Sequence, residues 1–396
     1  MYVTRPLSMY INQPSALSLP PPEGPNSGIL VLQDEEADLT CCFGLCKSNQ
    51  VLDLPFPQNK DLTLRYSSGG SNKHGDHFYA SFVPVLNLPL SSNRYYLMKT
   101  HGRHKGEALT NSSEEDMTSC CFCNIVSDVP PQPLDHNNTH QQFEVVRVEG
   151  LFNQWGQFTA RSVAPDGVPP RFLESKGWRA YTSTRQNFNL GEAPGQNPSL
   201  RARLPGFDFP LSRKSSDAVV VGKWYCPFMF IREGRLKDQV RNSAYYAMTL
   251  EQNWEQIFEC DSTYYAEGNN NSVAVDVSVQ TMRLSVSGNE AQVEDVANGI
   301  MWFTSHGNGE NEASRVGLSM AIVERMRWEQ ERAGYVWGNE RHVRVKKVDE
   351  LGGTDHGWNK YGCYVLVERF VLRRMDGSLV LSWEFKHIHH VRSKWD

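Results

Sequence analysis

Six of the nine cysteines stand in two short segments, DLTCCFGLC at 38–46 and DMTSCCFC at 116–123. Thiolates bind zinc well, and four of them make a closed structural site. Adjacent cysteines on a strand point to opposite faces, so only some pairs are spaced to share a metal ion. The better-spaced pairs are Cys42 with Cys46 and Cys121 with Cys123.

The spacing within these pairs differs between the two segments, whereas a shared zinc site would keep one chelate loop. Free cysteine is also among the most buried residue types. We therefore expect reduced, packed thiols and no bound metal or other cofactor. Palmitoylation and redox chemistry are two further uses of such thiols, and palmitoylation needs a second membrane anchor that is not evident.

The motif FKHIHHV near the C-terminus is a second candidate for metal binding. His387 and His389 share one face of an expected strand, a spacing that can place two imidazoles on one ion. On the same alternation His390 points the other way. Since the sequence does not bring a third ligand such as His342 or His356 close, histidines on a solvent-facing strand are the favoured interpretation.

No catalytic residue can be assigned from the sequence. It contains no phosphate-binding loop, G-x-S-x-G elbow, H-E-x-x-H motif or dinucleotide fingerprint. Glu324, Glu329 and Glu331 alternate with arginines in VERMRWEQER, which predicts ion pairs on a solvated helix face rather than a desolvated acid. We therefore lean against an enzyme.

Composition predicts a globular intracellular protein. The chain has 396 residues, 39% of them hydrophobic, and a formal net charge of −5. This length predicts two or three domains, and the charge favours no nucleic-acid partner, although basic segments lie near Trp337 and Trp395. No apolar run reaches the roughly 20 residues of a transmembrane helix, and no secretory signal is visible. The expected location is the cytoplasm, with the nucleus as the alternative.

The two cysteine segments belong to a predicted internal repeat. Each follows a strand-like run and an acidic stretch, and each precedes a Val-x-Asp-x-Pro motif and another strand. We predict a duplicated β module at 1–148, a loop-rich connector with one short helix at 149–218, and a C-terminal α+β domain at 219–396.

The C-terminal domain is expected to combine strands with helices. A capping box at Thr249 predicts a short helix, and an apolar line predicts a long one at about 313–332. SVAVDVSV alternates cleanly until a phase shift near Thr281, and Asp376-Gly377 predicts a hairpin between the last two strands. The expected fold class is α+β: mainly antiparallel strands, with the C-terminal sheet packed on the long helix.

Several motifs together resemble the plant family called domain of unknown function 1262. They include SLPPPEGPNSG, CCFGLC, LSSNRYYLM, EEDMTSCCFC, VVVGKWYCPFMFI and GCYVLVERFVLRRMDGSLVL. The resemblance implies a stress or defence context and transfers no catalytic residue. The favoured function is a module that binds a protein or a small molecule. An enzyme without recognisable motifs and a membrane-active, pore-forming protein stay open beside it, the latter suggested by alternating strands such as SVAVDVSV.

Overall fold

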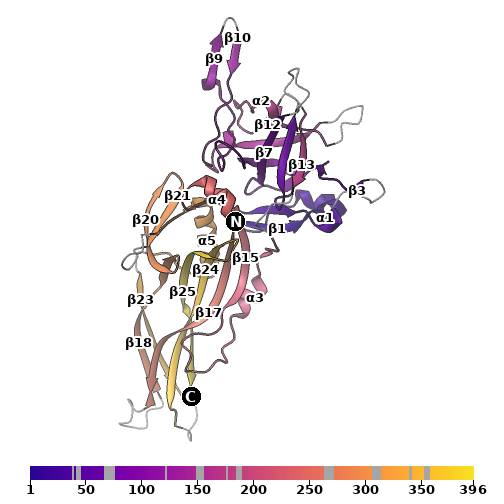
Figure 1. The fold of residues 1–396 in the computed structure, drawn as a ribbon. Coiled ribbons are helices and arrows are strands. Elements are labelled where there is room, and N and C mark those ends of the chain that lie inside the picture. The colour runs from indigo at the N-terminus through magenta and orange to yellow at the C-terminus, as the bar shows by residue number, and fades with distance from the viewer. Residues whose placement is uncertain are drawn as a thin grey trace.

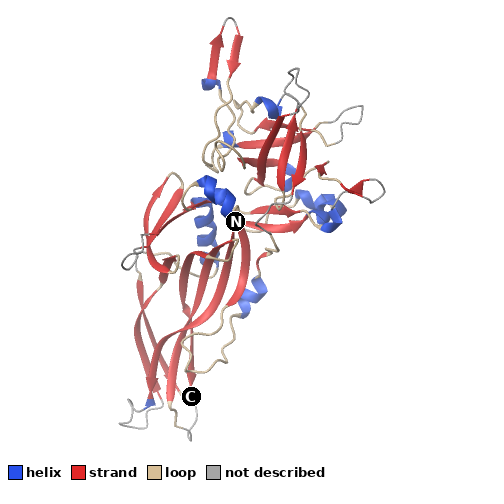
Figure 2. Cartoon of the chain, viewed as in Figure 1, coloured by secondary structure: helices blue, strands red, loops and turns tan. Residues whose placement is uncertain are grey.

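The computed structural model describes residues 1–37, 40–41, 46–66, 76–120, 123–148, 156–174, 177–183, 190–262, 272–305, 314–338, 341–351 and 357–396. Strands account for 49% of the described residues and helical residues for 17%, and Figure 2 shows the predominance of strands. The fold is therefore mainly β, and the α+β prediction is wrong. None of the described helices is long and apolar enough to cross a membrane.

The described helices are short. The α-helices are α1 Leu7–Asn12, α2 Arg171–Glu174, α3 Pro198–Arg203, α4 Leu236–Asn242 and α5 Met320–Arg332. The 3-10 helices are η1 Pro14–Ser18, η2 Glu35–Ala37, η4 Leu90–Ser92, η5 Glu114–Asp116, η6 Thr139–Gln141 and η7 Phe228–Phe230.

A twelve-stranded sheet forms the larger body. Its strands are β1 Tyr2–Pro6, β2 Gly28–Leu32, β14 Gly195–Gln196, β15 Val219–Pro227, β16 Ile231–Arg232, β17 Tyr245–Asp261, β19 Met282–Val286, β20 Asn289–Ala297, β21 Ile300–Ser305, β22 Ser314–Ser319, β24 Lys360–Arg374 and β25 Leu379–Trp395. They pair in the order β16-β22-β21-β20-β19-β25-β24-β17-β15-β1-β2, and β14 pairs with β15. The long strands β17, β24 and β25 run side by side down the molecule (Figure 1).

A seven-stranded sheet forms the upper part of the view (Figure 1). Its strands are β5 Gln50–Val51, β6 Asp61–Tyr66, β7 Asp76–Pro84, β8 Arg94–Lys99, β11 Gln142–Arg147, β12 Phe158–Ser162 and β13 Arg179–Ser183. They pair in the order β12-β11-β8-β7-β6-β13-β5. An aromatic cluster around Phe56, Phe158 and Trp178 fills the core of this part, where edge-to-face and tilted ring contacts add to apolar burial.

Within the described ranges, three strand pairs stand outside these sheets. They are β3 Thr40–Cys41 with β4 Cys46–Lys47, β9 Met117–Cys120 with β10 Cys123–Val126, and β18 Ser272–Gln280 with β23 His342–Glu350. The first two contain the cysteine segments, and each follows a 3-10 helix that begins with acidic residues. Cys42 and Cys121 lie outside the described residues. The repeat, and the domain boundaries that depend on it, stay predictions.

The prediction of a helix at Thr249 is wrong, because this segment is part of the long strand β17. Side chains at even positions from Tyr246 to Trp254 are buried, which is the period of a strand. Backbone pairing with β15 on one side and β24 on the other supports the extended form. Gln252 occupies one of these buried positions. Because it is polar, it interrupts the apolar–polar alternation by which a strand is predicted from sequence.

The helix expected at about 313–332 is also shorter than predicted. Residues 314–319 form strand β22, which pairs with β21 and β16, and α5 begins at Met320. Val316 and Leu318 thus face the core from a strand, with a period of two rather than 3.6. Val323 and Met326 are buried from the helix, as expected.

Further local predictions are confirmed. Asp376-Gly377 turns β24 into β25, with Gly377 at a φ of 86°. The phase shift at Thr281 marks the point where the chain leaves one sheet for another, since β18 pairs with β23 whereas β19 pairs with β25. Each feature depends on residues that are adjacent in sequence.

Candidate functional site

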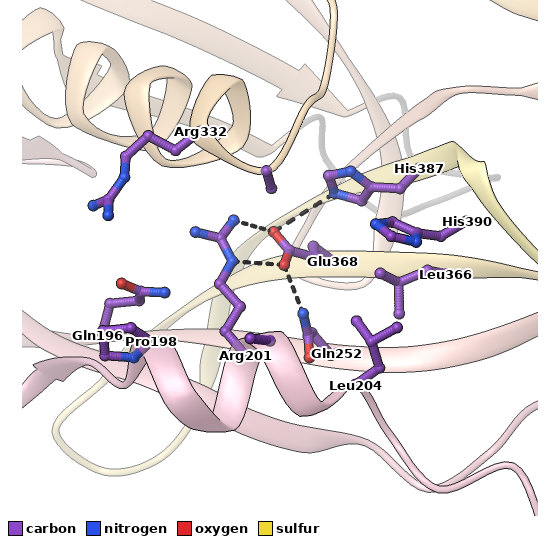
Figure 3. Close-up of a pocket in the computed structure, with 12 residues that line it drawn as sticks. Gln196, Pro198, Arg201, Leu204, Gln252, Arg332, Leu366, Glu368, His387 and His390 are labelled. Carbon is purple, nitrogen blue, oxygen red and sulfur yellow. Dashed lines mark hydrogen bonds and ion pairs between the residues drawn. The ribbon is translucent and has the colours of Figure 1, made fainter.

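A cavity lined by polar and apolar side chains in the described part of the chain has a volume of about 410 Å³. It lies between α3, the C-terminal end of α5 and the strands β17, β24 and β25 (Figure 3). Its floor is the carboxylate of Glu368, a charged side chain on β24 that is only 1% exposed. A carboxylate at this depth needs several hydrogen-bond donors to offset the loss of hydration.

Donors from four other elements surround that carboxylate. Arg201 on α3 makes a bidentate contact, with Nε 2.8 Å from Oε1 and Nη2 2.5 Å from Oε2. The amide nitrogens of Gln252 on β17 and Gln330 on α5 donate to Oε1 and Oε2, each over 2.8 Å. His387 Nε2 on β25 lies 3.6 Å from Oε2. Glu368 therefore has donors on both oxygens.

The same arginine links the cavity to a second buried ion pair. Arg201 Nη1 lies 3.1 Å from Glu329 Oε2, and Arg325 Nη2 donates to Glu329 Oε1 over 2.7 Å. Glu329 is fully buried, and Arg325 also donates to the Ser27 hydroxyl. The buried network thus contains two guanidinium groups and two carboxylates, and their formal charges cancel.

The network keeps Glu368 ionised. Burial alone would raise the pKa of Glu368, but the contacts with His387 and Arg201, together with the charges of both side chains, hold that pKa well below its usual range. Burial acts to lower the pKa of Arg201, and its two carboxylate partners more than offset this and raise it. Both partners are therefore held in their charged forms.

The hydrogen-bond pattern determines the orientation of the polar side chains. An ionised carboxylate only accepts, so Gln252 and Gln330 must turn their amide nitrogens toward Glu368. His387 Nε2 then lies 3.1 Å from the amide oxygen of Gln330, which is also an acceptor, so Nε2 must carry a proton.

Two buried polar atoms of cavity-lining residues have no protein partner. They are Gln252 Oε1 and His387 Nδ1, both without accessible surface, and His387 also lines a second cavity beside Tyr335. Figure 3 shows the amide nitrogen of Gln252 toward Glu368 and its oxygen on the opposite side. Buried polar atoms are normally hydrogen-bonded, so these two atoms are exceptions within the described structure.

Apolar and basic residues complete the cavity. Leu204 and Leu366 supply part of the apolar wall. Arg332 lies near the rim, 35% exposed, with its guanidinium 3.4 Å from Glu23 and over the ring of Trp328. The rim cation therefore already has partners of its own.

The C-terminal histidines do not follow the regular alternation of side chains along a strand. His387 and His389 have adjacent rings, with centroids 5.4 Å apart, but His389 is exposed and bonds to the backbone oxygen of Ala333. Residues 388–390 are unpaired in the register between β24 and β25. This irregularity brings His390 to the same cavity as His387, so the expected opposite orientation of His390 is wrong.

Burial, and then the charges of His389 and His387, lower the pKa of His390, so its neutral form is favoured. Among the described residues, no group of three or more His, Cys, Asp or Glu side chains could hold a metal ion. The backbones of Cys46 and Cys123 pair with those of Cys41 and Cys120, and their side chains are not described.

Sequence reasoning missed most of this site. Glu329 was expected on a solvated helix face, and it is fully buried. Glu324 and Glu331 from the same segment are exposed, as expected. One available signal was Glu368 itself, a charge within the apolar run YVLVERFVL, where burial demands a partner. Arg201 lies in a loop-rich segment, and no pattern in the surrounding sequence indicates that it is buried or paired.

Comparisons with known proteins give limited information. Residues 23–122 match the family described as "Protein of unknown function (DUF1262)", which is 100 of the 396 residues. No curated protein matches the chain. Among solved structures, "Crystal structure of Cry35Ab1" is similar, with 11% sequence identity, coverage of 85% of this chain and 90% of that chain, and a TM-score of 0.44. At this identity and TM-score, no property of that protein is transferred to this chain.

Proposed function

We propose that this chain is a binding protein that holds a small polar molecule in the cavity beside Glu368. The observation that carries the proposal is the cavity itself, whose wall combines the ionised Glu368 with the polar side chains Arg201 and Gln252 and with the apolar side chains Leu204 and Leu366. A volume of about 410 Å³ also lies within the usual range for ligand pockets.

The same geometry argues against acid–base catalysis by Glu368. A carboxylate has about four lone-pair positions, and Arg201, Gln252 and Gln330 donate four hydrogen bonds to its two oxygens. A general base needs a free lone pair within reach of the substrate and a pKa near the working pH. Glu368 has neither, since the network lowers its pKa. Its role in the proposal is to hold the cavity wall in place.

The cellular context of the proposal comes from the family resemblance. The match at 23–122 supports a relation to the uncharacterised family, whose plant members imply a stress or defence response. A ligand-binding protein in the cytoplasm or nucleus fits that context.

A library of small metabolites, screened by thermal shift, tests the proposal. Ala202 is exposed on α3 and lines the cavity, so Ala202→Trp fills the cavity with little risk to the core. Ser199→Trp, on an exposed position of the same helix, is the matched control. We expect a compound that raises the melting temperature of the wild type and of Ser199→Trp but not of Ala202→Trp. Compounds that stabilise all three proteins equally, or none, would contradict the proposal.

A second candidate function, membrane activity, is favoured by the strand pair β18–β23. The two strands pair over nine consecutive positions. Val273 and Val275 face the long strands in a small core with Tyr361, whereas Asp276 and Arg344 form an ion pair on the outer face. A strand needs about 9–11 residues and apolar–polar alternation to cross a bilayer. β18 and β23 each have nine residues, at the lower end of this range.

Dye release from vesicles of phosphatidylcholine and phosphatidylserine tests this second candidate. Val277 is half-buried on the inner face, and the neighbouring Ser278 is exposed on the outer face. If the pair enters the bilayer with its valine face toward lipid, Val277→Asn reduces dye release and Ser278→Asn does not. Vesicles that stay intact with the wild-type protein, or two variants with equal release, would argue against membrane activity.

A further inference from the structure

We propose that the exposed half of one sheet face in the upper part of the molecule binds single-stranded nucleic acid, a function separate from the cavity beside Glu368. The face is the outer surface of β13, β6 and β7, which are neighbours in the seven-stranded sheet (β7 and β13 in Figure 1). Ala80 and Ala180 are buried on the core side of these strands, and the alternate residues point outward. Val83, on the outer side of β7, is buried in the core of the larger body, so only part of the face is exposed.

The outer residues of the exposed part form two rows across the three strands. The first row consists of Arg179, Arg65 and His77, and the second of Tyr181, Thr63 and Tyr79. All three residues of the first row are exposed, and Tyr79 is 41% exposed in the second. Arginines and aromatic rings thus lie side by side on a surface that the rest of the described chain leaves open.

The two arginines of the first row repel each other. The backbone register places Arg179 directly opposite Arg65, and like charges in this arrangement destabilise a sheet. Among the described residues, neither arginine has a carboxylate partner. A phosphate group bound between them would remove the repulsion, because the guanidinium fork matches phosphate oxygens.

Two stacked pairs stand on either side of Thr63 in the second row. The guanidinium of Arg65 lies over the ring of Tyr181, 4.3 Å from its centroid. The ring of His101 lies 4.4 Å from the ring of Tyr79. Unpaired bases stack on aromatic side chains and on arginine planes. The two pairs are two strand spacings apart, about 9.5 Å, so each can hold a separate base.

The combination of both rows favours single-stranded nucleic acid over other anions. Surface cations alone attract any polyanion, whereas planar stacking groups beside opposed arginines match a ligand that carries bases and phosphates together. A duplex keeps its bases paired and stacked on one another, so it cannot use the stacking groups. The formal net charge of −5 is a sum over the whole chain and does not describe this face.

Fluorescence anisotropy of a labelled oligouridylate of about eight nucleotides tests the proposal on the full chain. Two phosphates neutralised by the two arginines give a slope of log affinity against log salt of about −1.4, and Arg179→Gln should reduce it to about −0.7. Tyr79→Ala should weaken binding about tenfold. Arg161→Gln, at an exposed position on β12 of the same sheet, is the matched control and should change neither quantity.

A charge reversal separates binding from folding. Arg179→Glu replaces the opposed arginines with an ion pair across β13 and β6, so its melting temperature should stay unchanged or rise while its binding is lost. If binding is lost only together with a lower melting temperature, the effect belongs to folding and the proposal is overturned.

Three further results would overturn the proposal. They are no binding at low salt, equal binding of an abasic oligonucleotide of the same length, and equal binding of a duplex. Equal binding of the abasic probe would assign the face to polyanions in general, such as sulfated glycans. Ala202→Trp fills the cavity beside Glu368 and should bind the oligouridylate as the wild type does, so this test and the metabolite screen can fail separately.

Discussion

Replacing Glu368 with glutamine should destabilise the protein strongly. The substitution keeps the shape of the side chain but removes the charge that pairs with Arg201 at 2.5 Å, in a site where Glu368 is 1% exposed. The network would then hold two guanidinium groups against the single carboxylate of Glu329. Breaking one side of a buried ion pair costs about 3–5 kcal/mol, a large share of a typical total stability of about 5–15 kcal/mol.

A second variant separates the charge imbalance from the loss of contacts. Removing both partners, as in Arg201→Met with Glu368→Leu, leaves the Arg325–Glu329 pair balanced. Apolar replacement of a whole buried pair is often close to neutral, so the double variant should lose less stability than the sum of Arg201→Met and Glu368→Leu.

Urea denaturation followed by tryptophan fluorescence measures these free energies of unfolding. Glu331→Gln, an exposed glutamate on α5, is the control and should change stability by less than about 0.5 kcal/mol. The reasoning is refuted if Glu368→Gln costs under about 1 kcal/mol, or if the double variant loses the full sum of the two single variants.

Three further predictions can be checked with standard assays. The folded state holds the pKa of Glu368 below the ordinary value of 4.5. The ionised carboxylate therefore stabilises the folded state above pH 4.5, and this stabilisation is lost as the pH falls toward the pKa of the folded state. Acid denaturation of Glu368→Gln should lack this component. Val323 is fully buried, so Val323→Asp should abolish the cooperative urea transition of the larger body while Glu324→Asp, at an exposed position, preserves it. Protein purified without chelator should contain no zinc by elemental analysis, whereas one zinc per chain, lost together with stability when Cys46 and Cys123 become serine, would establish a structural metal site.

Local features of this fold could be predicted from the sequence, because short-range physics determines them. The hairpin at Asp376-Gly377 depends on turn residues, and the break at Thr281 follows from a change in the side-chain alternation. β17 could not be predicted in the same way. Gln252 interrupts its apolar face because it hydrogen-bonds to Glu368, a residue 116 positions away. The local capping-box pattern at Thr249 therefore predicts a helix, although pairing with strands that are distant in sequence stabilises the extended conformation.

The candidate site could not be predicted from the sequence for a similar reason. Arg201 and Glu368 are 167 positions apart, and they meet only because α3 packs against the long strands. The position of His390 depends on the register irregularity in β25, which the motif HIHH does not encode. Glu329 looked like one more surface glutamate in an alternating-charge helix, since the sequence does not show which face of α5 the sheet covers.

The thermal-shift comparison of the wild type, Ser199→Trp and Ala202→Trp tests the central claim most directly, because the proposed binding depends on the cavity beside Glu368. The account predicts a compound in the metabolite library that raises the melting temperature of the wild type and of Ser199→Trp and leaves that of Ala202→Trp unchanged. Equal stabilisation of all three proteins by every active compound, or no stabilisation of any of them, would contradict the account.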